Sequence, residues 1–211
     1  MIKKVYGSLN KDKKILYIIN HKAGNTSIRN ALKNYGYPNN FGAHTHFINP
    51  EELNYIFTFV RNPYERLLSR YGHLRRRIIQ LENGAKIGNR PHDTNLLDFF
   101  NGSPIKIENF TFKDFVKFTQ KVFDCHWEPQ VDKFKSQVIT LDNIDFIGRF
   151  ENLQEDFNVV CDKIGIPRQQ LPHDNKTEHK HYAEYYDKET RQIVAEKYAE
   201  DIKNFGYEFG E

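Results

Sequence analysis

Two apolar segments, each followed by a turn and an amphipathic helix, constrain the fold of this chain most strongly. Residues 15–19 and Tyr55–Val60 are almost continuous apolar runs, as expected of strands buried on both faces of a sheet. After the first run come a polar turn and apolar residues at helical spacing over residues 28–35. After the second, Pro63 is placed to open a helix with an apolar stripe along residues 64–78. Two such strand–turn–helix units predict an α/β fold.

The rest of the chain continues this alternation. Apolar spacing predicts helices over residues 110–122, 153–164 and 187–204, and short strands over residues 138–141 and 146–147. Gly36 and Gly165 are expected at helix C-termini. We therefore expect one domain over residues 1–211 with a P-loop-like, three-layer α/β sandwich, in which helices flank a central, mainly parallel sheet.

Composition narrows the class of protein further. The 211 residues include 17 Phe and 12 Tyr, which supply a sizeable core and argue against wholesale disorder. Two cysteines, Cys125 and Cys161, exclude a disulfide-rich scaffold and are expected to be free thiols. The net charge of +3 suits an anionic ligand but does not indicate nucleic acid. Because no apolar run approaches the roughly 20 residues that cross a bilayer, we expect no integral membrane segment and a cytoplasmic protein.

The first turn has the composition of a phosphate-binding loop, because backbone amides, hydroxyl groups and a helix N-terminus follow a buried strand. It is not a P-loop of the form G-x-x-x-x-G-K-[ST], since the lysine precedes the glycine and the first glycine is missing. The alternative is an ordinary turn capped by Asn25 or Thr26. The candidate anion-binding residues are Lys22, Ala23, Gly24, Asn25, Thr26 and Ser27.

The second turn carries a candidate for a further phosphate group. Arg61 follows directly on the second strand, at the edge where α/β sheets bind ligands. Ser69 lies within the helix that follows. An arginine fork and a serine hydroxyl are suitable donors to a phosphate. For either residue alone, a surface position without function is the alternative.

Together these two segments resemble the sulfotransferase superfamily. The strongest likeness, in residues 59–71 (F-V-R-N-P-Y-E-R-L-L-S-R-Y), is to the carbohydrate-modifying branch with the heparan and chondroitin sulfotransferases and their bacterial relatives. Residues 126–130 (H-W-E-P-Q), 146–153 (F-I-G-R-F-E-N-L) and 185–209 resemble further segments of that branch. The resemblance covers residues 15–209. One departure is Asn25, where the branch most often has serine or threonine.

The resemblance implies that the donor is 3′-phosphoadenosine 5′-phosphosulfate (PAPS), that PAP is the product, and that no metal is required. By this resemblance, residues 22–27 hold the 5′-phosphosulfate, and Arg61 and Ser69 hold the 3′-phosphate.

Two further donor contacts are less specific. Arg149 follows a predicted strand and could reach the donor, although pairing with Glu151 is the alternative. Lys176 belongs to a basic run that lies near the donor in this family, and a solvated charged loop is the alternative.

A histidine is the expected base, because sulfuryl transfer needs an acceptor hydroxyl made nucleophilic near neutral pH. The branch carries a histidine in the interval occupied here by His44-Thr45-His46. By this resemblance, alignment on Glu51 and the strand beyond it favours His46, with His44 as second choice or supporting partner. Lys22 would stabilise the charge that develops on the leaving phosphate oxygen. Without the resemblance, the alternative that both histidines are loop residues without a catalytic role is as good. A metal site is not indicated, because the pair supplies only two ligands.

The acceptor implied by the resemblance is a carbohydrate hydroxyl, on a polysaccharide or a glycolipid. If the acceptor is lipid-linked, the protein would make peripheral contact with it at the membrane. His126 and Trp127 could line an acceptor groove, because sugars stack on aromatic faces, or they could anchor their loop in the core. Two alternative functions are a P-loop-type kinase for a nucleotide or small molecule and a non-catalytic binder of an anionic glycan or nucleotide. No nucleic-acid partner is expected.

Overall fold

Residues 3–38, 44–86, 96–97, 99–100, 106–135, 139–172 and 180–211 are described by the computed structural model of the protein. They form two compact units, each made of two separate stretches of chain. The sheet unit comprises Met1–Asn62 and Glu128–Lys176, and the helical unit comprises Pro63–Trp127 and Thr177–Glu211. The single domain expected over the whole length stays a prediction.

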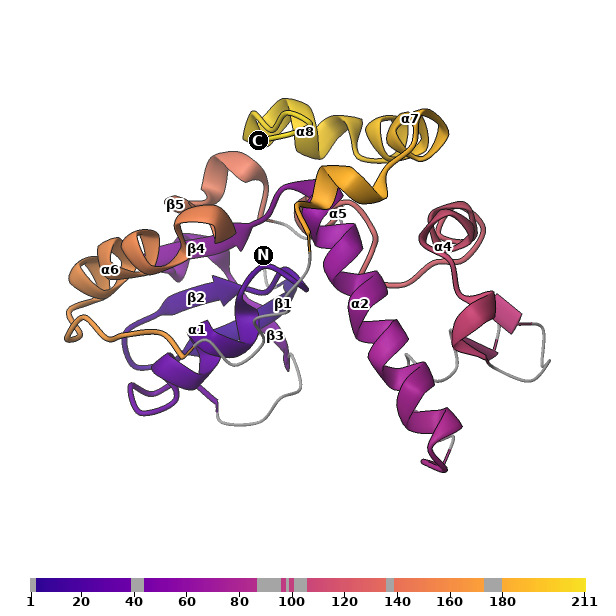
Figure 1. Ribbon diagram of the computed structural model, residues 1–211. Helices are drawn as coiled ribbons and strands as arrows, with labels where there is room; N and C mark the ends of the chain where they lie inside the picture. The colour runs from indigo at the N-terminus through magenta and orange to yellow at the C-terminus, as the bar shows by residue number, and fades with distance from the viewer. Residues whose placement is uncertain are drawn as a thin grey trace. The chain divides into compact units, whose positions relative to one another are not determined.

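The sheet unit is built on five strands in the order β3-β1-β2-β4-β5 (Figure 1). Their bounds are β1 Lys3–Asn10, β2 Ile15–Ile18, β3 His44–Ile48, β4 Tyr55–Val60 and β5 Phe146–Arg149. Strand β4 pairs in parallel with β2 and with β5, while β1 is antiparallel to both of its neighbours, β2 and β3. Four of the five strands thus run in one direction. The expected α/β fold with a mainly parallel sheet flanked by helices is confirmed.

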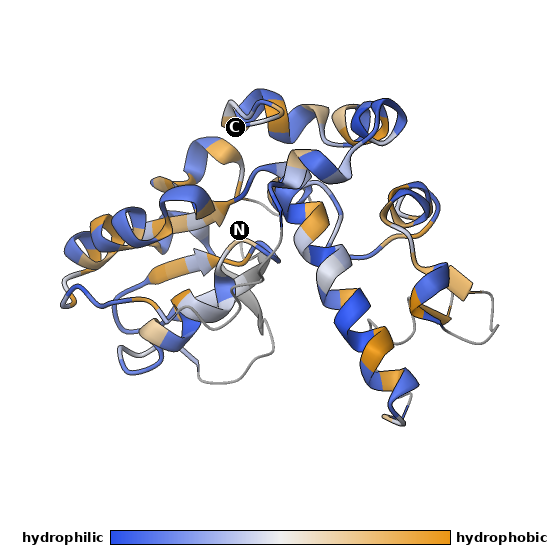
Figure 2. Cartoon of the chain, in the orientation of Figure 1, coloured by the Kyte–Doolittle hydropathy of each residue, from blue (hydrophilic) through white to orange (hydrophobic). Residues whose placement is uncertain are grey.

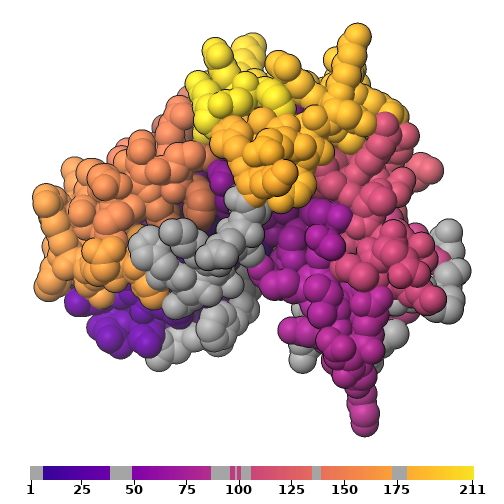
Figure 3. Space-filling view, in the orientation of Figure 1, coloured from indigo at the N-terminus to yellow at the C-terminus, as the bar shows by residue number. Residues whose placement is uncertain are grey.

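Alternation along the two central strands directs one set of side chains toward helices α1 (Asn25–Leu32) and α6 (Leu153–Ile164). Strands β2 and β4 are apolar along most of their length, as Figure 2 shows. In the space-filling view, the orange atoms of α6 form much of the visible surface of this unit (Figure 3). The shared core includes Tyr17, Ile19, Ile28, Ala31, Leu32, Phe57, Phe59, Phe157, Val160, Cys161 and Ile164.

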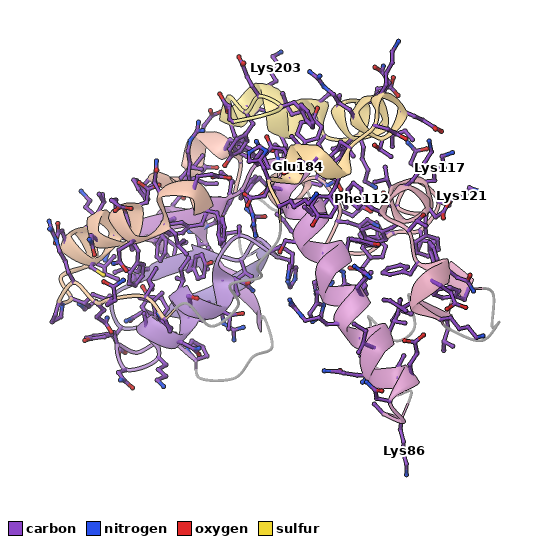
Figure 4. The ribbon with its side chains drawn as sticks, in the orientation of Figure 1. Lys86, Phe112, Lys117, Lys121, Glu184 and Lys203 are labelled. Atoms are coloured by element: carbon purple, nitrogen blue, oxygen red, sulfur yellow. The ribbon has the colours of Figure 1, made fainter. Side chains whose placement is uncertain are left out.

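The helical unit packs around α2 (Pro63–Glu82), whose predicted apolar stripe is buried along its whole length. Phe112, labelled in Figure 4, packs edge-to-face on Tyr71 with ring centroids 5.3 Å apart. The Tyr71 hydroxyl donates to the Phe110 carbonyl at 2.6 Å. Other helices of this unit are η2 Ile107–Asn109, α4 Phe112–Phe118, η5 Tyr182–Tyr185, α7 Lys188–Lys197 and α8 Ala199–Phe205, and residues 96–97 and 99–100 are also helical. Within the part of the chain that the structure describes, no helix is both long and apolar enough to cross a membrane.

Several predicted boundaries are corrected. The strand expected over residues 138–141 is wrong at residues 139–141, because Leu141–Asn143 form the 3-10 helix η3, closed by a capping box between Thr140 and Asn143. Residue 138 lies outside the described residues. The last helix is broken at Tyr198, whose φ of −109° and ψ of 24° separate α7 from α8. Its hydroxyl donates to the Trp127 carbonyl, which holds this break in the core.

Two other helices are shorter than expected. Helix α4 covers only Phe112–Phe118, after Thr111 caps its N-terminus by accepting from the Asp114 amide. Helix α1 ends at Leu32, and Gly36, with φ of 82°, lies in the turn that follows. The predicted helix over residues 153–164 is confirmed, and Gly165 ends it in a left-handed conformation with φ of 69°. Among its described residues, the sheet unit also contains the short helices η1 Pro50–Glu52, η4 Phe150–Asn152 and α5 Asp132–Lys135.

Candidate active site

The first candidate loop joins β2 to α1 through two residues in the left-handed region. Lys22 has φ of 70° and Gly24 has φ of 77°. A non-glycine residue rarely adopts this conformation, and such strain tends to occur at functional sites. Gly24 occupies the N-cap of α1 and brings no side chain to it, and the first turn of the helix contains no acidic residue. The positive end of α1 is therefore not occupied by a carboxylate of its own first turn, as an anion site requires.

The residues of this loop differ in burial and in the contacts that they make. A Cβ at Gly24 would lie 2.8 Å from the Cδ atoms of Leu153 in α6, so a larger residue would have to displace that side chain and also adopt a left-handed conformation. Ala23 is fully buried in the core, whereas Asn25 and Thr26 are half-buried. Ser27 donates its hydroxyl hydrogen to the Pro172 carbonyl at 2.8 Å, so in this conformation it ties the loop to residue 172.

Arg61 is the residue that brings the two predicted anion-binding elements together. It follows β4, is 7% exposed, and its Nη1 donates to the Lys22 carbonyl at 3.2 Å. Its guanidinium carbon lies 3.8 Å from the centre of the Phe150 ring, within cation–π distance. The carboxyl ends of β2, β4 and β5 thus meet at one edge of the sheet, where Arg61 touches residues that follow the other two strands.

Strand β5 and the turn after it support this edge. A Cβ at Gly148 would lie 2.4 Å from Cε1 of Phe59, so only glycine allows β5 to pack against β4 here. The backbone amide of Arg149 donates to Asp156 at 2.6 Å. Glu151 accepts a hydrogen bond from the Asn62 amide at 2.7 Å, which anchors the turn at the end of β4.

The histidine pair lies on an edge strand rather than in a loop. His44 and His46 belong to β3, which pairs with β1. Gly7 of β1 pairs with Ile18 on one side and with His44 on the other, so His44 is level with the last residue of β2. His46 pairs with Val5 and lies beyond the end of β2. The backbone register therefore places both histidines at the end of the sheet where β2 leads into the Lys22 loop.

Two further predicted residues lie outside the described part of the sheet unit. Ser69 is half-buried on α2, in the helical unit. Lys176 lies outside the described residues.

His126 belongs to the helical unit and is held by a buried carboxylate. One oxygen of Asp124 accepts from both the backbone amide of His126, at 2.7 Å, and its Nδ1, at 2.6 Å. The other oxygen lies 3.6 Å from Nη2 of Arg70, which is 1% exposed. Burial lowers the pKa of Arg70 to about 10, and Asp124 and Cys125 partly offset this decrease, so the guanidinium stays charged at neutral pH.

Trp127 is completely buried, so of its two predicted roles the structure supports the anchoring of its loop in the core. Its ring packs perpendicular to Phe115, with centroids 5.6 Å apart, and lies 5.5 Å from the Arg70 guanidinium carbon. Its Nε1 donates to the Val122 carbonyl at 2.9 Å. Cys125 and Cys161 are free thiols, as expected.

Gln130 and Phe150 contribute to the Arg61 environment but were not identified from the sequence. Both lie in segments that resemble the family, H-W-E-P-Q and F-I-G-R-F-E-N-L. The sequence thus identifies the two motifs but not the contacts that these residues make with Arg61. Gln130 touches the backbone of a residue 69 positions away in the chain, which no local pattern can show.

Comparison with known proteins agrees with these motifs. An uncharacterised protein of Archaeoglobus fulgidus is 30% identical over 115 residues, which cover 54% of this chain and 70% of the archaeal protein. Human carbohydrate sulfotransferase 9 is 27% identical over 175 residues, covering 77% of this chain but only 38% of the human protein. No solved structure matches the chain. Residues 8–208 match the Sulfotransferase family, and with that match over most of its length the chain belongs to this family.

Proposed function

We propose that the protein is a sulfotransferase that moves a sulfuryl group from PAPS to a carbohydrate hydroxyl. Family membership supports the sulfotransferase class. The similarity to human carbohydrate sulfotransferase 9 supports a carbohydrate acceptor, either a polysaccharide or a glycolipid. The observation that carries the proposal is the contact of Arg61 Nη1 with the Lys22 carbonyl, because it joins both candidate anion-binding elements at one sheet edge.

The residues at this edge suit a donor with two separated anionic groups. Residues 22–27 offer a lysine, backbone amides and the N-terminus of α1 for the 5′-phosphosulfate. Arg61 offers a buried guanidinium for the 3′-phosphate, with Ser69, Arg149 and Lys176 as further proposed contacts. These side chains are cationic or neutral, which is consistent with charge neutralisation without a metal.

The proposed chemistry is an in-line transfer. A bond forms between the acceptor oxygen and sulfur, while the bond between sulfur and the bridging phosphate oxygen breaks. Lys22 stabilises the negative charge that appears on this leaving oxygen. His46 takes the proton of the acceptor hydroxyl, with His44 as the second choice for this role or as a supporting partner. His126, held by Asp124, is proposed as a contact to the acceptor rather than to the donor.

The assigned roles of Lys22 and His46 can be tested with ³⁵S-labelled PAPS and a panel of polysaccharide and glycolipid acceptors. We expect the variants Lys22→Ala and His46→Ala to lose about a hundredfold or more of the turnover, as is typical when a proton-transfer or charge-stabilising group is removed. Binding of PAP by His46→Ala should remain close to that of the wild type, since the base faces the acceptor in this scheme.

The matched control is Lys11→Ala, which removes an exposed lysine in the turn between β1 and β2. We expect this variant to keep full turnover. Wild-type turnover in both Lys22→Ala and His46→Ala would contradict their roles and leave a non-catalytic binder of anionic ligands as the better interpretation.

A further inference from the structure

Gln130 makes an unusual contact with the backbone of Arg61. Its Oε1 accepts from the Arg61 amide at 2.9 Å, and its Nε2 donates to the Arg61 carbonyl, also at 2.9 Å. The primary amide of glutamine has the same donor and acceptor groups as a peptide unit. Gln130 therefore satisfies both backbone groups of the residue that directly follows β4, whose last pair joins Val60 to Arg149.

This contact is completely shielded from water. Gln130 is 0% exposed and Arg61 is 7% exposed. A hydrogen bond with a buried backbone group is costly to lose, because the partner left behind cannot turn to solvent. The backbone of Arg61 is therefore held firmly at the end of the strand.

The guanidinium end of Arg61 is also supported. The Phe150 ring lies 3.8 Å from the guanidinium carbon, and Nη1 donates to the Lys22 carbonyl at 3.2 Å. The ring and the carbonyl together restrict the positions that the guanidinium can take. Glu151 adds a hydrogen bond to the neighbouring amide of Asn62 at 2.7 Å. Arg61 is thus held from its backbone to its tip before any ligand binds.

We propose that Gln130 and Phe150 are positioning residues that orient Arg61 toward one phosphate group of the donor. This inference rests on the proposed function, in which that group is the 3′-phosphate. An arginine side chain that is already ordered loses little conformational freedom when it binds an anion, so positioning translates directly into affinity. The two residues act only through Arg61, and their effect should be confined to ligands that carry the 3′-phosphate.

The test compares PAP with 5′-AMP, which differ only in the 3′-phosphate, by isothermal titration calorimetry. In the wild type we expect PAP to bind at least a hundredfold more tightly than 5′-AMP. In Gln130→Met, which has a similar volume but cannot make either hydrogen bond, this ratio should fall at least tenfold, through weaker binding of PAP and not of 5′-AMP. Phe150→Leu applies the same test to a half-buried residue that is less critical for folding, and a several-fold fall in the ratio is expected.

The matched control is Asn10→Leu. The Asn10 amide also makes two hydrogen bonds to backbone groups, accepting from the Lys13 amide and donating to the Tyr35 carbonyl, and its side chain is buried. Asn10 pairs with Ile15 at the opposite end of β2 from the Lys22 loop. We expect Asn10→Leu to lower the stability of the protein but to preserve the wild-type ratio of PAP to 5′-AMP affinities.

The possible results separate the inference from the function on which it rests. A wild-type ratio in both Gln130→Met and Phe150→Leu would overturn the positioning role while the donor assignment survives. An equal fall of the ratio in Asn10→Leu would also overturn it, since any loss of stability would then have the same effect. A wild-type protein that does not distinguish PAP from 5′-AMP would overturn both.

Discussion

Asp124 shows how a single residue can have its charge determined by its surroundings. Burial raises the pKa of its carboxyl group, but hydrogen bonds from the side chain and backbone of His126, together with the positive charge of Arg70, outweigh burial. The net pKa lies below the ordinary value, so the carboxylate is ionised at neutral pH. Since an ionised carboxylate only accepts hydrogen bonds, Nδ1 of His126 carries the proton of that contact.

This lowered pKa predicts a pH-dependent contribution to stability. Because the folded pKa of Asp124 lies below its unfolded value of about 3.9, the contribution is complete above that pH and is lost as the pH falls through the folded pKa. We expect Asp124→Asn to lower the free energy of unfolding by about 1–3 kcal/mol at pH 7. Urea unfolding of both proteins between pH 3 and 7 measures this difference. A difference that stays constant down to pH 3 would contradict the assignment.

At the residue scale, the sequence was sufficient to identify charged groups but not their buried partners. Arg61 was recognisable because it follows an apolar strand, the position at which α/β sheets bind ligands. Its partners Gln130 and Phe150 come from distant parts of the chain, and their contacts depend on the tertiary fold. The sequence alone allows Trp127 to lie either in the core or in an acceptor groove. Its complete burial in the structure decides in favour of the core.

At the scale of elements, the pairing of β5 with β4 depends on Gly148. We expect Gly148→Ala to destabilise the protein by about 1–3 kcal/mol, because the new methyl group would lie 2.4 Å from the Phe59 ring, deep in the core. Gly72→Ala is the control, since a Cβ there meets nothing within 4 Å and alanine favours the interior of a helix such as α2. Thermal or urea unfolding compares the two variants. Equal stability of Gly148→Ala and the wild type would show that β5 can move away from Phe59.

Elements with strong local patterns were predictable, and those that depend on distant partners were not. The continuous apolar runs predicted β2 and β4, and helical spacing predicted α2 and α6. Strand β1 was missed because its sequence, K-K-V-Y-G-S-L-N, is largely polar and its two partners come later in the chain. Strand β3, with the sequence H-T-H-F-I, is too short and polar to predict locally, and its partner β1 lies far earlier in the chain, so the sequence alone leaves His44 and His46 as loop residues. The division between α7 and α8 reflects a tertiary contact, the hydrogen bond from Tyr198 to Trp127, and not a local signal.

At the scale of the whole molecule, the fold class followed from the order of elements, whereas the division into units did not. Alternating strands and helices were enough to predict a mainly parallel sheet. The two compact units each combine an early and a late stretch of chain, which length and composition do not reveal. Arg61 belongs to the sheet unit and Ser69 to the helical unit, although the two residues are close in the sequence.

The central claim is that this chain binds a 3′-phosphorylated adenosine donor, and the most direct test is calorimetric titration of the wild-type protein with PAP and, separately, with Mg-ATP. We predict one PAP per chain and at least tenfold weaker binding of Mg-ATP. At a free PAP concentration of 100 times its dissociation constant, the folded state should gain about 2.7 kcal/mol of stability. Binding of Mg-ATP without binding of PAP would contradict the account and favour a kinase with a similar fold.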